Sequence, residues 1–321
     1  MPDGYTVAVV GAGLVGERLV SELRRRDFPL KELRVLARSE RRQEIDGTIF
    51  EVGIAGPDAF EGVDFAFFAG TEGEKGAAAQ LAEAAISRGA VVIDNGSDFR
   101  LDPEVPLVVP EVNARALEGH SGLIANPNCS TTQMVVSLTP LAREFGIRKV
   151  VVSTYQAVSG SGRGGVEALE DGKEGVYPKP ISGNAIPVIG SIGEDGYSTE
   201  ERKMILESRK ILGLPDLEVH PTAVRIPVHT GHSESIYVET VREVTREEVL
   251  DAFRAAPGVT FSGDADGFPT PLEIAGDSGV HVGRVRASGN AVEYWCVADN
   301  LLKGAATNAV QIAEALVGAR V

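Results

Sequence analysis

One cysteine stands in a setting that suits covalent chemistry. Cys129 lies in the segment NPNCSTT (126–132), just before the apolar helical run MVVSLTPLAREF (134–145). At the start of a helix, the dipole and the free N–H groups favour a thiolate, which is the nucleophilic form of cysteine. We expect Ser130 or Thr131 to cap this helix. Cys129 is therefore the candidate nucleophile.

The second cysteine has a different predicted role. Cys296 lies in the apolar segment Tyr-Trp-Cys-Val, where a cysteine packs as a small hydrophobic residue. Nothing in the spacing of the two cysteines points to a disulfide or a zinc site, and we expect no bound metal.

A glycine motif near the N-terminus predicts a dinucleotide site. Gly11, Gly13 and Gly16 form G-x-G-x-x-G directly after an apolar strand (6–10) and at the start of a helix (14–26). These glycines let the turn close and let the backbone approach a pyrophosphate, which the helix N-terminus attracts. A plain strand–helix turn is the alternative.

The end of the second strand favours NADP over NAD. NAD enzymes usually place an acid about 20 residues on, where it binds the ribose 2′-hydroxyl. Here the strand (33–37) is followed by Arg38 and Ser39, with Arg41 and Arg42 close behind. Arg38 can pair with a 2′-phosphate, which an acid would repel. The alternative is that these arginines belong to a solvated surface loop.

A thiolate beside a nicotinamide suggests one reaction. The sulfur forms a thiohemiacetal with an aldehyde, hydride leaves to the cofactor, and phosphate attacks the resulting thioester to give an acyl phosphate. This chemistry needs a base near neutral pKa, for which histidine is the usual choice. In RIPVHTGHSES we choose His232, with His229 as the rival, and Arg225 is a natural clamp for a carboxylate.

The surrounding pattern predicts the elements that position these residues. Strands alternate with helices in the first part of the chain, which indicates βαβ units and a Rossmann-type, doubly wound parallel sheet. After Cys129 the alternation stops, and glycine-rich loops (159–165, 190–196) separate strands, which indicates an α+β domain with a mixed, largely antiparallel sheet. The predicted parts are residues 1–127, residues 128–299 and a C-terminal helical segment, 300–321, that returns to the first domain.

Length and charge restrict the classes of protein. A chain of 321 residues usually forms two domains. The net charge of −15 disfavours nucleic acids and anionic membranes as partners. No apolar run approaches the roughly 18 residues that a membrane-spanning helix needs, so we expect a cytoplasmic enzyme.

Longer motifs resemble the bacterial-type aspartate-semialdehyde dehydrogenase family over nearly the whole chain. They are VVIDNGSDFRLD, PLVVPEVN, NPNCST, YQAVSGSG, ESRKIL, VRIPVHTGHS and DNLLKGAATNAVQIAE. The resemblance implies that aspartate semialdehyde, phosphate and NADP⁺ interconvert with aspartyl phosphate and NADPH, in lysine, methionine and threonine biosynthesis. It also implies a homodimer or homotetramer formed through the second domain.

The resemblance assigns roles to residues in three groups. The catalytic residues are Cys129, His232 and Gln156, and Gln156 orients the acyl group. The substrate-binding residues are Arg225 for the carboxylate, Glu207 for the ammonium, and Lys210, Arg100 and Asn128 for phosphate. The cofactor-binding residues are Gly11, Ala12, Gly13, Leu14, Val15, Gly16, Arg38, Ser39, Gly70, Thr71, Asn95, Ser159, Gly160, Asn300 and Gly304. By position alone, Glu207 and Lys210 would be an exposed helical i,i+3 pair.

The chain departs from the family pattern in two places. The glycine loop GAGLVG is one residue shorter than usual, and AGTEGEKG brings the acids Glu72 and Glu74 close to the expected cofactor. Two other functions stay open. N-acetylglutamyl-phosphate reductase shares this plan, but its neutral substrate nitrogen gains no ion pair from Glu207. A catalytically silent NADP-binding paralogue need not keep Cys129, Gln156 and His232.

Overall fold

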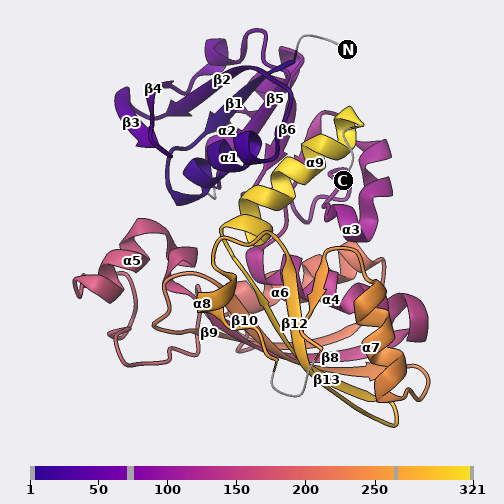
Figure 1. Cartoon of the computed structure of the whole chain (residues 1–321). Helices are drawn as coiled ribbons and strands as arrows, with labels where there is room; N and C mark the ends of the chain where they lie inside the picture. Colours follow the sequence, from indigo (N-terminus) through magenta and orange to yellow (C-terminus); the bar gives the residue numbers. More distant parts are fainter. Residues whose placement is uncertain (1–3, 71–75, 264–266, 319–321) are drawn as a thin grey trace. The chain divides into compact units, whose positions relative to one another are not determined.

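The computed structural model describes residues 4–70, 76–263 and 267–318, in two compact units. Unit 1 comprises Met1–Pro127 and Ala305–Val321, and unit 2 comprises Asn128–Gly304 (Figure 1). Residues 300–304, which the sequence grouped with the C-terminal segment, therefore belong to unit 2.

Unit 1 is built on a sheet that is parallel apart from one pair. Within the described residues its seven strands follow the order β3-β4-β2-β1-β5-β6-β7, and β3 and β4 alone pair antiparallel. The strand order reverses on either side of β1, which confirms the predicted doubly wound sheet. The strands are β1 (Tyr5–Val10), β2 (Leu30–Ala37), β3 (Arg41–Ile45), β4 (Thr48–Ile54), β5 (Phe65–Phe68), β6 (Val91–Asp94) and β7 (Leu123–Ala125).

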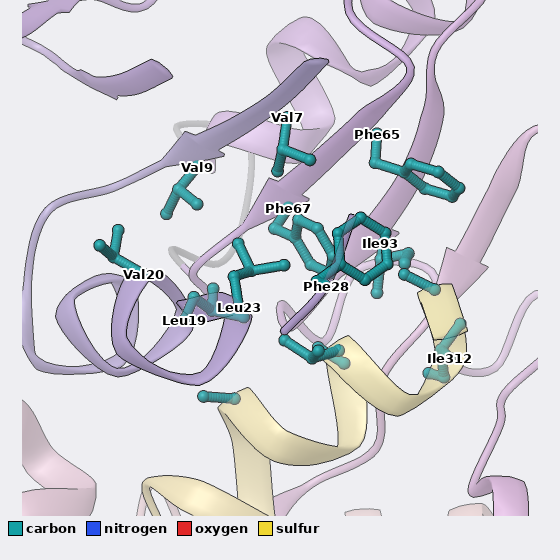
Figure 2. Close-up of a cluster of buried hydrophobic side chains, with 14 of the residues drawn as sticks. Val7, Val9, Leu19, Val20, Leu23, Phe28, Phe65, Phe67, Ile93 and Ile312 are labelled. Atoms are coloured by element: carbon teal, nitrogen blue, oxygen red, sulfur yellow. The ribbon is translucent and has the colours of Figure 1, made fainter. Parts of the chain in front are cut away.

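Helices cover this sheet and complete its hydrophobic core. The helical elements are α1 (Leu14–Arg25), η1 (Pro57–Phe60), α2 (Ala77–Ser87), α3 (Pro110–Asn113), η2 (Ala114–Gly119) and α9 (Thr307–Val317). Figure 2 shows Leu19 and Leu23 of α1 beside Phe67 of β5, with Ile312 of α9 in the same cluster. The last helix of the chain therefore packs into the core that the first helix begins.

The hairpin formed by β3 and β4 was not predicted. Arg41 and Arg42, assigned to the region after the second strand, begin the edge strand β3. The turn consists of Asp46 and Gly47, both with positive φ, which is the type of turn that Asp-Gly favours. An edge strand that carries charged side chains lacks the hydrophobic alternation by which strands are recognised.

Unit 2 contains a mixed, largely antiparallel sheet, as predicted. Its six described strands follow the order β11-β12-β13-β10-β8-β9, and the central pairs β12–β13, β13–β10 and β10–β8 are antiparallel. The strands are β8 (Ile147–Gln156), β9 (Glu218–Arg225), β10 (His232–Thr240), β11 (Val259–Phe261), β12 (Val280–Ser288) and β13 (Ala291–Ala298).

One helix of unit 2 is buried on every side. Helix α4 (Cys129–Phe145) contacts β8, β10 and β13 of the sheet as well as α6 and α7, and all its residues from Ser130 to Leu141 are buried. The other helical elements are η3 (Val158–Ser161), α5 (Gly162–Glu170), α6 (Thr199–Leu212), α7 (Arg246–Ala255) and α8 (Pro271–Ile274), and the π-helical turn η4 (Leu302–Ala306) begins in unit 2 and ends in unit 1. The prediction of a loop at 159–165 was wrong, because η3 and α5 occupy this glycine-rich stretch.

Candidate active site

Cys129 is the first residue of α4, and the residue before it caps the helix. The side-chain oxygen of Asn128 accepts hydrogen bonds from the backbone N–H groups of Ser130 and Thr131, at 3.0 and 3.1 Å. The expectation that Ser130 or Thr131 forms the cap was therefore wrong, because both lie inside the first turn as donors. The half-buried Cys129 keeps the predicted place at the positive end of the helix dipole.

Two acids of α6 hold Asn128 in place. Glu207 Oε2 accepts from the Asn128 backbone nitrogen at 2.7 Å, and Glu200 Oε1 accepts from Asn128 Nδ2 at 2.9 Å. Both acids are buried, and Lys210 is half-buried. The reading of Glu207 and Lys210 as an exposed helical pair is thus excluded by the burial of Glu207.

Gln156 ends β8 beside the same acid. Its Nε2 lies 3.3 Å from Glu200 Oε1 and 3.3 Å from the Thr154 hydroxyl oxygen, and the side chain is buried. Glu200 thus contacts both Asn128, which caps α4, and Gln156, which ends β8. Sequence reasoning missed it, because an acid in the first turn of a polar helix ordinarily faces solvent and complements the dipole.

His232 begins β10 and is fully buried. Its Nδ1 accepts from the Ala157 backbone nitrogen at 3.0 Å, while Nε2 has no hydrogen-bond partner among the described residues. Because a backbone nitrogen always donates, the neutral ring carries its proton on Nε2. Burial, together with the positive charge of Arg225, holds the pKa of His232 well below its ordinary value. The imidazole is therefore neutral at physiological pH.

Arg225, at the end of β9, is hydrogen-bonded to the same residue, Ala157. Its guanidinium donates to the Ala157 carbonyl oxygen at 2.5 Å, and the side chain is buried. A Cβ atom on Gly160 would lie 2.8 Å from Arg225 Nη1 and 3.3 Å from His232 Nε2. Glycine at this position therefore leaves room for the guanidinium and the imidazole to lie side by side.

The rival histidine lies at the surface. The side chain of His229 is 58% exposed, and its Nδ1 is 3.6 Å from an oxygen of Glu170. Its backbone carbonyl accepts from the Ser159 nitrogen, which ties the two loops together. His229 thus has a place in the loop structure, whereas His232 is the buried histidine next to Arg225.

Three residues expected at the cofactor support the elements around Cys129 and His232. Asn300 accepts from the Gly231 backbone nitrogen at 2.9 Å and donates to the Ser159 hydroxyl oxygen at 3.0 Å. A Cβ atom on Gly304 would lie 2.8 Å from the Cβ of Cys129. These contacts give Ser159, Asn300 and Gly304 positioning tasks within unit 2, alongside the cofactor role that stays a prediction.

A buried acid follows His232 on the same strand. Both carboxyl oxygens of Glu234 lack a hydrogen-bond partner among the described residues, and burial raises its pKa well above the ordinary value. Nearby, Gln133 of α4 donates to the His232 backbone carbonyl at 3.2 Å. Burial also raises the pKa of the Cys296 thiol well above its ordinary value, in keeping with a packing role.

The glycine loop of unit 1 has the geometry that a dinucleotide requires. A Cβ atom on Gly16 would lie 1.7 Å from the Gly11 carbonyl oxygen, so strand and helix can meet only at glycine. At Gly13 a Cβ would meet nothing within 4 Å, and this residue is the N-cap of α1, where no side chain caps the helix. The loop, which includes Ala12, Leu14 and Val15, therefore leaves open space at a helix N-terminus, where a pyrophosphate fits.

The β3–β4 hairpin adds contacts to this loop that the sequence did not suggest. Gln43 Nε2 donates to the Ala12 carbonyl oxygen at 3.0 Å and to Glu17 at 2.6 Å. Arg38 and Ser39, just past the end of β2, are exposed. Their exposure leaves the Arg38 guanidinium accessible to a ligand phosphate.

The remaining predicted residues of unit 1 lie beyond the ends of neighbouring strands. Gly70 follows β5, and Asn95 follows β6 and donates to the Phe68 carbonyl oxygen at 2.9 Å. Buried Arg100 donates to the backbone carbonyls of Asn95 and Asn126, at 2.7 and 2.9 Å. Thr71, Glu72 and Glu74 lie outside the described residues.

In the described part of the chain, no group of three or more His, Cys, Asp and Glu side chains is arranged to hold a metal ion. None of the described helices is both long and apolar enough to cross a bilayer.

Comparison with known proteins adds to this geometry. Residues 6–120 match the model of the semialdehyde dehydrogenase NAD binding domain, and residues 138–303 match that of the semialdehyde dehydrogenase dimerisation domain. The aspartate-semialdehyde dehydrogenase of Bacillus subtilis is 44% identical, with 98% of each chain covered. The chain belongs to the aspartate-semialdehyde dehydrogenase family.

Other members of the family are similarly close. The aspartate-semialdehyde dehydrogenase of Aquifex aeolicus is 45% identical, again with 98% of each chain covered. The crystal structure of aspartate semialdehyde dehydrogenase II from Vibrio cholerae, in complex with ASA, has a TM-score of 0.93 and 40% identity, and the alignment covers 99% of each chain. The family resemblance inferred from the motifs is confirmed.

Proposed function

We propose that this member of the family catalyses the aspartate-semialdehyde dehydrogenase reaction. L-Aspartate-4-semialdehyde, phosphate and NADP⁺ interconvert with 4-aspartyl phosphate and NADPH. In the cell the reaction runs toward the semialdehyde, in the cytoplasm, and feeds diaminopimelate, lysine, methionine and threonine synthesis. The observation that carries the proposal is the connected set in unit 2, where Glu200 joins the Asn128 cap to Gln156 and Ala157 joins Arg225 to His232.

Cys129 is the nucleophile. Its thiolate attacks the carbonyl carbon of aspartyl phosphate, the bond from carbon to the bridging oxygen breaks, and inorganic phosphate leaves. The product is a thioester on Cys129. When bound, the nicotinamide cofactor supplies the hydride that reduces this carbon, or accepts it in the reverse direction. Breakage of the carbon–sulfur bond then releases the aldehyde and restores the thiolate.

His232 acts as a hydrogen-bond donor in its neutral form. With Nδ1 occupied by the Ala157 N–H, the proton on Nε2 is the one available to the substrate. Negative charge develops on the carbonyl oxygen whenever sulfur or hydride adds to the carbon, and a buried donor stabilises that charge. This proposed role differs from the base that the sequence suggested: neutral His232 stabilises an oxyanion, and the thiolate route needs no proton removed from a thiohemiacetal.

The charged groups offer one partner for each part of the substrate. Arg225 binds the α-carboxylate, and its burial strengthens a charge-assisted bond. Glu207 binds the ammonium group. Phosphate contacts come from Lys210, Arg100 and Asn128. A free ammonium group favours aspartyl phosphate over an N-acylated substrate, because a buried carboxylate gains an ion pair only from the former.

Unit 1 binds the nicotinamide dinucleotide, as its match to the NAD binding domain implies. The pyrophosphate lies at the loop Gly11–Gly16, and exposed Arg38 with Ser39 binds the 2′-phosphate of NADP. We further propose a homodimer formed through unit 2, in keeping with its match to a dimerisation domain, and a homotetramer remains compatible with that interface.

One assay tests the proposal. NADPH formation is followed with aspartate semialdehyde, with and without phosphate, and in parallel with N-acetylglutamate semialdehyde. We expect phosphate-dependent NADPH formation with aspartate semialdehyde alone. Turnover of the N-acetylated aldehyde would indicate the N-acetylglutamyl-phosphate reductase function. If neither aldehyde were turned over, the chain would be a catalytically silent paralogue.

A further inference from the structure

The side chain of Glu200 is buried, although the capping of α6 does not depend on this residue. It is the second residue of α6, and only 8% of it is exposed. The capping of α6 is done by its neighbours, because Ser198 and Glu201 form a complete capping box. Glu201 also accepts from the Ala223 backbone nitrogen at 2.9 Å, which ties α6 to β9. The start of the helix is therefore stabilised without Glu200.

One oxygen of Glu200 receives two amide groups. Oε1 accepts from Asn128 Nδ2 at 2.9 Å and from Gln156 Nε2 at 3.3 Å. Asn128 immediately precedes Cys129, and Gln156 ends the strand that leads to the peptide holding His232. A single carboxylate thus connects both segments.

An ionised carboxylate accepts hydrogen bonds and donates none, so it selects one orientation of each amide. Asn128 must turn its nitrogen to Glu200, which leaves its oxygen for the N–H groups of Ser130 and Thr131. Gln156 must also turn its nitrogen to Glu200. If Asn128 reversed, an NH₂ group would face backbone donors and the cap of α4 would be lost.

We propose that Glu200 is a positioning residue for the thiol reaction. It fixes the side-chain amide of Asn128 in the orientation that keeps α4 capped at Cys129, and it fixes the amide of Gln156 with its nitrogen toward Glu200. This inference deepens the proposed function and rests on it. Glu200 acts through the two amides.

Two variants separate this role from packing and from charge. Glu200→Gln keeps an acceptor oxygen in nearly the same place, whereas Glu200→Met keeps a similar volume without one. We expect kcat to fall by at least about tenfold in Glu200→Met, the rate equivalent of one charge-assisted hydrogen bond. In Glu200→Gln it should stay within a few-fold of wild type. Glu194→Gln removes one negative charge at an exposed position six residues earlier in the chain and should leave kcat unchanged.

A purely space-filling role or a purely electrostatic role of Glu200 would give different kinetics in these variants. If Glu200 only fills space, Glu200→Met retains its kcat. If it acts only through its charge, both variants change equally, and KM for phosphate falls in both because a nearby negative charge is gone. Either result overturns the proposal.

A second readout does not depend on the assigned substrate. The rate at which iodoacetamide alkylates Cys129 is measured against pH in each variant. We expect this profile to shift to higher pH in Glu200→Met and to stay near wild type in Glu200→Gln, because the capped helix end favours the thiolate. Equal profiles would refute positioning. A wild-type enzyme inactive on aspartate semialdehyde would refute only the proposed function.

Discussion

Replacing Gly304 with alanine would place a methyl group against the carbon that carries the reactive sulfur. The new Cβ would lie 2.8 Å from Cys129 Cβ and 3.2 Å from its Cα, so no flexible side-chain end is available to move aside. Both segments are held in place. Asn128 is bonded to two buried acids, and the turn at 302–304 is bonded to Asp299.

The size of the effect follows from these distances. The shorter contact is about 0.6 Å closer than the 3.4 Å at which ordinary contact begins. Overpacking of this kind costs about 1–3 kcal/mol of folding free energy. Displacement of a reacting group by about 1 Å costs roughly 10²-fold in rate. We therefore expect kcat to fall between about tenfold and a hundredfold, with a lowered Tm.

The control is Gly164→Ala in α5, where the added Cβ would meet only a methyl group of Val176 at an ordinary 3.7 Å. Steady-state rates, thermal unfolding and alkylation of Cys129 are measured for both variants. Gly164→Ala should keep its kcat and gain slightly in Tm, because alanine is the better helix former. If Gly304→Ala kept both its kcat and its Tm, Gly304 would not be needed for close approach, and the reasoning would fail.

The other predictions concern four side chains. Cys129→Ser should lose nearly all turnover yet bind NADPH normally in fluorescence titration, and near-normal rates would contradict covalent catalysis. His232→Asn should lower kcat by roughly 10²-fold, the effect of losing one donor to an oxyanion. Because burial lowers the pKa of His232, the acid limb of the wild-type pH–rate profile should lie below the ordinary 6.5, and a His232-dependent limb above it would refute the neutral donor. Arg38→Ala should weaken NADP binding more than NAD binding; equal weakening would move the 2′-phosphate contact elsewhere. The raised pKa of Glu234 means that the folded chain keeps a proton that the unfolded chain releases, so the free energy of unfolding falls as pH rises above the ordinary 4.5. Glu234→Gln should remove this dependence in denaturant titrations, and an unchanged dependence would mean that Glu234 is ionised in the fold.

Two placements that depend on continuous motifs were predicted correctly: the glycine loop between β1 and α1, and Cys129 at a helix start. The Gly11–Gly16 loop follows its strand and precedes its helix as expected, since Gly11 adopts a positive φ and Gly16 lies against the Gly11 carbonyl oxygen. Cys129 at a helix start followed from the same kind of local pattern. The hairpin beginning at Arg41 was missed, although Asp46 and Gly47 provided a turn signal, because its charged edge strand shows no hydrophobic periodicity.

Partnerships between distant residues required the folded chain. Glu200 reads as a solvent-facing first-turn acid until α6 packs against α4 and turns it toward Asn128 and Gln156. Likewise, His232 and His229 carry the same side chain three residues apart, and the entry into β10 buries one while the other stays in solvent. Residue type specifies which reactions a side chain is able to perform. Its neighbours, protonation state and orientation depend on contacts between segments far apart in the chain, and no local pattern encodes them.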